Sequence, residues 1–78
     1  MDPQVAWNEL LLAVANRKWK QAEDHAENLL EWMHKGGFPP QTTKVEMQQR
    51  WNRAMAEFGC LIALQYVQAA KTRKSGRR

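Results

Sequence analysis

Histidine, cysteine and carboxylate side chains are the groups in this sequence from which a metal site would have to be built. The two histidines, His25 and His34, are nine residues apart, which is not the i, i+4 spacing that puts two ligands on one helix face. Cys60 is the only thiol. Glu31 and His34 have the carboxylate-x-x-His spacing of di-iron helical bundles, but a second motif and two further inward glutamates are missing. We therefore expect neither a metal site nor a cofactor.

The sequence gives equally little support to nucleophilic catalysis and phosphate binding. Cys60 lies in an apolar run without a histidine or a basic residue beside it, and burial in such surroundings raises the pKa of a thiol. Because the thiolate is the reactive form, we expect this cysteine to be an inert core residue. The chain contains neither a glycine-rich phosphate loop nor a nucleotide fingerprint. The expected function is therefore not enzymatic.

The basic C-terminal segment, residues 71–78, is the remaining candidate for chemistry. Five of its eight residues are cationic, enough for phosphate contacts through counterion release. The segment has no asparagine or glutamine to read bases, and the nearest aromatic residue, Tyr66, is too far back in the sequence to stack on one. A solvated tail is the plainer interpretation, while contact with nucleic acid, an acidic protein or an anionic membrane stays open. The cations concerned are Lys71, Arg73, Lys74, Arg77 and Arg78.

Proline, glycine and capping residues mark the ends of the helices that would position these groups. Asp2-Pro3 predicts an N-cap followed by the first helical residue. The run Gly-Gly-Phe-Pro-Pro at 36–40 predicts a helix end in a left-handed glycine, followed by prolines that prevent the helix from resuming. Thr43 and Glu46 have the spacing of a capping box, which predicts the start of the last helix.

The first two helical segments meet at a polar triplet, residues 16–18. Between residues 3–15 and 18–35 the apolar stripe advances by roughly 80°, more than the ~20° per heptad of supercoil drift explains. A continuous helix would also bury Lys18, whereas Asn16 tolerates the left-handed conformation of a tight turn. We therefore favour a break at the triplet. The alternative is one unbroken helix over residues 3–35.

The sequence Trp19-x-x-Ala22-x-x-x-Ala26-x-x-Leu29 resembles the second helix of a tetratricopeptide hairpin. The resemblance covers about eleven residues and occurs once, and the preceding segment has Glu9 where that family has an apolar residue. Stacked repeats need roughly three or more copies to bury their faces. The resemblance therefore implies a helical hairpin and no particular function.

The last helix is expected to run from residue 43 to residue 74. Beyond Phe58 its polar face nearly vanishes, which is typical of a helix buried on all sides. A helix of about 30 residues is about 45 Å long, whereas partners of about 13 and 18 residues reach only about 20 and 27 Å. The surplus would expose an apolar patch, and burial against a second copy is the simplest remedy. We assign its inner stripe to Met47, Trp51, Ala54, Met55, Phe58, Leu61 and Ile62.

The charge distribution and the tryptophan content say only a little about the partner of the chain. Residues 1–43 carry four basic and six acidic residues, whereas residues 44–78 carry eight basic and two acidic. This asymmetry indicates self-association or an anionic partner without choosing between them. We expect the basic residues Lys44, Arg50 and Arg53 to complement the acidic ridge of the middle helix, and each of the four tryptophans to favour the core over an interface. No signal peptide or membrane-spanning stretch is visible, so a cytoplasmic location is expected.

Together these patterns predict an all-α protein with a single domain over residues 1–74 and a flexible basic tail over 75–78. The domain is a three-helix antiparallel bundle (3–16, 18–35 and 43–74) or a hairpin of two long helices, completed by dimerisation. The expected function is binding or assembly through an apolar helix face. The alternative is a nucleic-acid accessory role of the basic C-terminal segment. We predict a protein interface formed by Phe58, Leu61, Ile62, Leu64, Tyr66 and Val67.

Overall fold

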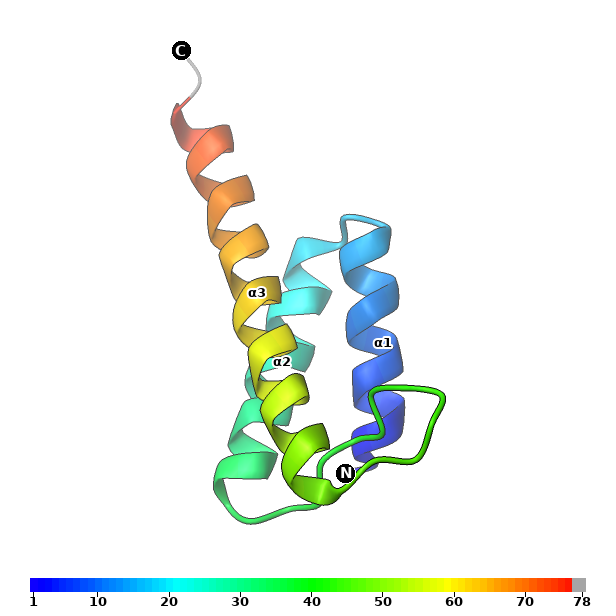
Figure 1. The fold of residues 1–78 in the computed structure, drawn as a ribbon. Helices are drawn as coiled ribbons and strands as arrows, with labels where there is room; N and C mark the ends of the chain where they lie inside the picture. Colours follow the sequence, from blue (N-terminus) through cyan, green and yellow to red (C-terminus); the bar gives the residue numbers. More distant parts are fainter. Residues whose placement is uncertain (77–78) are drawn as a thin grey trace.

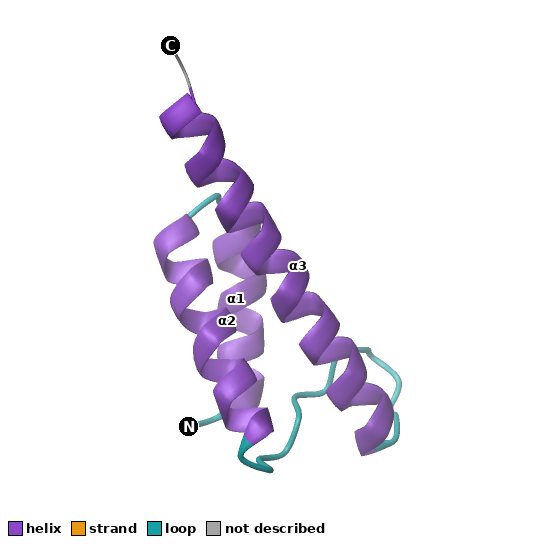
Figure 2. Ribbon diagram, turned by 90° about the vertical axis from the view of Figure 1, so that its left-hand side faces the viewer, coloured by secondary structure: helices purple, strands orange, loops and turns teal. Residues whose placement is uncertain are grey.

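A computed structural model of the chain contains three α-helices, α1 (Pro3–Ala15), α2 (Trp19–His34) and α3 (Gln49–Gly76) (Figure 1). It describes residues 1–76, with side chains described through residue 72. The helices α1 and α2 form a hairpin, and α3 lies against this pair, antiparallel to α2 (Figures 1 and 2). The all-α prediction is confirmed. The alternative of two long helices is wrong, because the first helical segment does break.

The start of α1 follows from its capping residue. Asp2 precedes Pro3, and its carboxylate Oδ1 accepts hydrogen bonds from the backbone N–H groups of Gln4 (3.0 Å) and Val5 (3.3 Å). Two amides that the helix leaves unpaired at its start are thereby satisfied. The predicted N-cap is confirmed.

The turn between α1 and α2 occupies the predicted triplet, but a different residue takes the left-handed conformation. Asn16 has a φ of −96°, whereas Arg17 has a φ of +59°. The backbone N–H of Lys18 then donates to the carbonyl of Ala13 at 2.8 Å, which closes the turn. The chain therefore reverses in three residues, and Lys18 stays exposed.

The end of α2 is set by its two glycines. Gly36 adopts a φ of +91°, as the sequence predicted. Gly37 leaves room for the Trp32 indole, since a Cβ at this position would overlap that ring. The indole Nε1 donates to the carbonyl of Phe38 at 2.8 Å, so the tryptophan fixes the path of the loop.

Two cations of α3 bind α2, and one of them does so in a way the sequence did not predict. The Arg53 guanidinium does not face the acidic ridge of α2. It donates to the carbonyls of Met33 (2.9 Å) and Gly37 (3.2 Å) at the C-terminal end of that helix, where carbonyls lack helical partners. The acidic ridge is met instead by Lys71, whose Nζ lies 3.1 Å from Oε2 of Glu23.

The helix α3 begins at Gln49, six residues after the predicted start at Thr43. The predicted capping box is wrong, because the Thr43 hydroxyl donates to the carbonyl of Val45 at 2.6 Å. The loop is bound instead to the first turn of α3. Both the backbone N–H and the hydroxyl of Thr42 donate to Oδ1 of the buried Asn52, at 3.2 and 3.0 Å. Because these hydrogen bonds fix the loop, α3 does not start earlier in the sequence.

The core lies between the hairpin of α1 and α2 and a face of α3 made of small side chains, which we call the small-residue face. The predicted inner stripe of α3 is wrong: Trp51, Phe58 and Leu61 in that stripe are exposed. Small side chains allow the two helix axes to approach closely and pack without voids, so they occupy the contact with α2. The small-residue face consists of Asn52, Ala56, Cys60, Ala63 and Val67.

The helix α2 contributes one apolar stripe to the core. Ala22, Ala26, Leu29 and Met33 are buried, and Leu30 packs against them at the edge of the core. The helix α3, with 28 residues, is much longer than α1 and α2, with 13 and 16. Its last turns therefore extend beyond the hairpin (Figure 1), so the predicted mismatch in length is present. No helix in the described part of the chain is long and apolar enough to cross a membrane.

Candidate functional site: an uncovered apolar helix face

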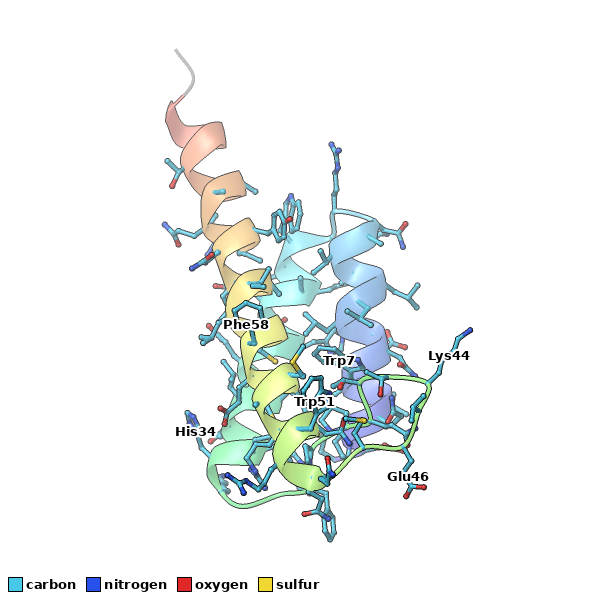
Figure 3. All side chains as sticks on the ribbon, viewed as in Figure 1. Trp7, His34, Lys44, Glu46, Trp51 and Phe58 are labelled. Carbon is cyan, nitrogen blue, oxygen red and sulfur yellow. The ribbon has the colours of Figure 1, made fainter. Side chains whose placement is uncertain are left out.

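A row of large apolar side chains on α3 is left uncovered, and we call it the α3 apolar face. The three aromatic members, Trp51, Phe58 and Tyr66, are 45%, 59% and 55% exposed. Met55 and Ile62 lie between them in the same row, at the i, i+4, i+7, i+11 spacing of one helix face. Figure 3 shows Trp51 and Phe58 projecting from α3. The chain thus presents three half-exposed aromatic rings along one line.

The α3 apolar face borders a groove toward α1. The helix α3 packs mainly against α2 and touches α1 much less, so a hollow of about 270 Å³ remains between α1 and α3. Gly59 brings the two helices together at its base: a Cβ there would lie 2.5 Å from Cη2 of Trp7, which is itself buried. The hollow is lined by Leu10, Leu11, Val14, Ala15, Gly59, Ile62, Ala63 and Tyr66.

An aromatic pair lies at the C-terminal end of the face. The rings of Tyr66 and Trp19 stack with centroids 6.4 Å apart and planes 13° from parallel. Together with Val14 and Arg17 they line a cleft of about 390 Å³ beside the groove. The stacked pair thus marks the C-terminal end of the face.

The six predicted interface residues divide between surface and core. Leu61 is exposed but lies on another side of α3, Leu64 is half-buried, and Val67 belongs to the small-residue face. These three therefore do not form the α3 apolar face. The remaining three, Phe58, Ile62 and Tyr66, do.

Sequence reasoning missed part of this surface. The sequence assigns Trp51 and Met55 to the inner stripe, whereas both are exposed. The signal that would have identified them is the second stripe of α3. Its small residues, from Asn52 to Val67, repeat at helical spacing as regularly as the large ones do.

The groups with catalytic or metal-binding potential are not brought together. Burial raises the pKa of the Cys60 thiol to about 12, and the nearby Glu57 carboxylate adds to this, so the inert cysteine that the sequence predicted is supported. The carboxylate of Glu31 lies 3.4 Å from Nζ of Lys35, and His34 is exposed at the end of α2, pointing outward in Figure 3. Within the described range, no three His, Cys, Asp or Glu residues are grouped as metal ligands.

Only one of the five predicted anion-contacting cations has a described side chain. Lys71 forms its ion pair with Glu23. Arg73 and Lys74 lie in the last turns of α3, and their side chains fall outside the described part, as do Arg77 and Arg78 altogether.

Comparison of the chain with protein-family models, with curated proteins and with solved structures found no match.

Proposed function

We propose that this protein acts by binding and assembly, not by catalysis, and that the α3 apolar face is its binding surface. Its first partner is a second copy of the chain, so that the working form is a homodimer. The observation that carries this proposal is the half exposure of three aromatic rings, Trp51, Phe58 and Tyr66, in one row on one helix. Aromatic residues arranged in this way are the usual anchors of protein interfaces.

The total accessible surface of the chain is larger than that of a typical compact monomer, and this supports the presence of an interface. Its accessible surface is 5745 Å², whereas a compact monomer of 9.1 kDa is expected to expose about 4,900 Å². The excess of about 800 Å², before the projecting end of α3 is subtracted, is of the size that each partner buries in a standard interface. Part of the excess comes from the last turns of α3, which project beyond the hairpin (Figure 1). The rest is consistent with an exposed face that a partner covers.

The aromatic rings alone supply much of the association energy that such a dimer needs. With half of each ring exposed, the three offer on the order of 300 Å² per copy. At about 25 cal/mol per Å², burying this area on both copies contributes about 15 kcal/mol before costs. The loss of translational and rotational freedom offsets about 4–15 kcal/mol of it. The remaining apolar members of the face and groove must therefore contribute, and we expect a dissociation constant in the micromolar range.

A second copy suits the face because the face is uncharged and carries both a ridge and a hollow. No charged residue lies within the row from Trp51 to Tyr66, so two copies meet without like-charge repulsion at the contact. Phe58 projects from the row, and the groove toward α1 is hollow. A two-fold symmetric interface needs such self-complementarity, since the same patch serves both subunits.

Sedimentation equilibrium over about 1 to 100 micromolar protein tests the proposal, since the expected association falls in this range. We expect a reversible monomer–dimer equilibrium for the natural sequence. Phe58→Glu should weaken it at least about tenfold, because the interface would bury an unpaired charge.

The matched control is Leu12→Glu. Leu12 is as exposed as Phe58, 59% in both cases, but it lies beside a different hollow, between α1 and the start of α2. The control should dimerise like the natural sequence. A strict monomer at all concentrations, or equal effects of the two substitutions with circular dichroism unchanged, would overturn the proposal.

A further inference from the structure

We infer that the cleft between the α1–α2 turn and α3 binds small aromatic carboxylates. The cleft, of about 390 Å³, is lined by Val14, Arg17, Trp19 and Tyr66. The Arg17 guanidinium pairs with the carboxylate of the ligand, and the ring of the ligand packs on the exposed part of the Trp19–Tyr66 pair. The site goes beyond the proposed function, because Arg17 and Trp19 lie outside the α3 apolar face.

The cleft lies in the corner that the difference in helix length creates. The turn of residues 16–18 ends the hairpin, and the last turns of α3 continue past it (Figure 1). Residues of the hairpin therefore form one wall of the cleft, and Tyr66 of α3 forms the other. Its volume lies within the range of roughly 300–1,000 Å³ that is typical of small-molecule sites. A ligand with two fused rings and one carboxylate is small enough to enter it.

Arg17 supplies a cation that the fold itself does not use. Its side chain is exposed and forms no hydrogen bond or ion pair within the part of the chain that the structure describes. A guanidinium binds a carboxylate through two parallel N–H donors, which fixes the orientation of the anion as well as its position. None of the residues that line the cleft is acidic, so no carboxylate of the lining competes for this cation.

The net charge of the cleft determines the charge of the ligand. Arg17 is the charged member of its lining. The next residue, Lys18, lines a different hollow, between α1 and the start of α2, and Lys71 of α3 is paired with Glu23. One cation balances one negative charge. A carboxylate therefore suits the site better than a phosphate monoester, which carries up to about two charges.

The aromatic pair determines which carboxylates fit. The rings of Trp19 and Tyr66 are nearly parallel, with centroids 6.4 Å apart, and more than half of the Tyr66 side chain is exposed. An aromatic ring gains more from packing against such rings than its area alone provides, because the edges and faces of the rings attract each other. An aliphatic acid lacks this contribution, so the site favours aromatic acids.

The backbone conformation of Arg17 makes its side chain separable from the fold. Its φ of +59° is the only positive value at a residue other than glycine in the described range. Glycine adopts this conformation without strain, whereas a residue with a Cβ is strained in it. The turn should therefore form about as well with glycine at this position, and the guanidinium can be removed without loss of the fold.

Titration of the chain with 2-naphthoate, followed by NMR, tests the inference. The reporter is the indole N–H resonance of Trp19, which is assigned by its absence from the spectrum of Trp19→Phe. We expect a saturable shift with a dissociation constant of about 1 millimolar, as is usual for a ligand of this size in an open cleft. The neutral 2-naphthamide keeps the rings and should bind at least about tenfold more weakly, because it lacks the charge-assisted hydrogen bonds.

Variants of the turn separate the site from the fold. Arg17→Gly should weaken 2-naphthoate binding at least about tenfold, leave 2-naphthamide binding unchanged and not lower the temperature of thermal unfolding. Arg17→Asn repeats the test with a second residue that tolerates the left-handed conformation. The matched control is Lys18→Ala, which removes the same charge one residue away and should bind 2-naphthoate like the natural sequence.

Three results would overturn the inference. The first is the absence of a saturable shift at Trp19. The second is equal binding of 2-naphthoate and 2-naphthamide, which would show apolar packing without recognition of the anion. The third is equal weakening by Arg17→Gly and Lys18→Ala, which would show a general effect of charge. None of them bears on the homodimer, which the sedimentation experiment decides separately.

Discussion

The two sides of α3 differ in side-chain size and, against expectation, the smaller side is the buried one. Ala56 and Cys60 on the small-residue face are completely buried against α2, whereas Phe58, two residues from each, is 59% exposed. Both sides are apolar enough to form a core. The comparison teaches that contact distance decides which side faces inward within the chain: small residues fit where a helix already lies close. The large residues remain on the outer side, where the proposed partner would pack.

The largest expected effect comes from enlarging a side chain on the small-residue face. Ala56→Leu places a bulky group where α3 touches α2, and overpacking of this kind should lower the free energy of unfolding by about 3 kcal/mol. Ala54→Leu is the matched control, because Ala54 is exposed two residues away on the same helix. It should change stability by less than about 0.5 kcal/mol. Urea unfolding measures both, and equal effects would contradict the assignment of the two sides.

The smallest expected effect concerns the ionisation of the buried thiol on that same face. An unfolded cysteine has a pKa of about 8.5, whereas burial raises the pKa of Cys60 to about 12. Between these values the unfolded chain loses the proton and the folded chain keeps it, so stability is complete below about pH 8.5 and falls as the pH rises toward 12.

The measurement compares the natural sequence with Cys60→Ala by urea unfolding at pH 8 and pH 10. The natural sequence should lose about 2 kcal/mol more than the variant over this interval, since the other titrating groups are common to both. An identical pH dependence of the two proteins would show that the thiol is not held in the small-residue face.

The first two helices could be predicted from the sequence because local signals and tertiary packing agree there. The carboxylate of Asp2 caps α1, and Gly36 ends α2 in the left-handed conformation, with no need for distant partners. In α2, large residues such as Leu29 and Met33 fall on the face that is buried, so size and burial indicate the same stripe. These elements are recognised by rules that act within a few residues.

The features that could not be predicted depend on contacts made across the fold. The capping box at Thr43 does not form, because the loop that contains it is hydrogen-bonded to Asn52. The guanidinium of Arg53 binds carbonyls of α2, and no sequence pattern indicates this contact. The orientation of α3 was missed because both of its stripes are apolar. If the stripes are ranked by hydrophobicity, Phe58 is expected to be buried before Ala56. The short distance between α3 and α2 has the opposite effect, because only the smaller side chain fits there. The predicted surplus of apolar surface was nevertheless the feature that identified the candidate site.

The most direct test of the central claim compares the only two phenylalanines of the chain. Phe58, on the α3 apolar face, and Phe38, in the loop after α2, are 59% and 67% exposed within one copy. Hydroxyl-radical footprinting, read by mass spectrometry, measures the labelling of each ring above and below the concentration at which the chain associates. The account predicts that Phe58 becomes protected on association while Phe38 is labelled equally at both concentrations. Equal labelling of Phe58 in both states, in a chain that does associate, would show that the α3 apolar face is not the surface it uses.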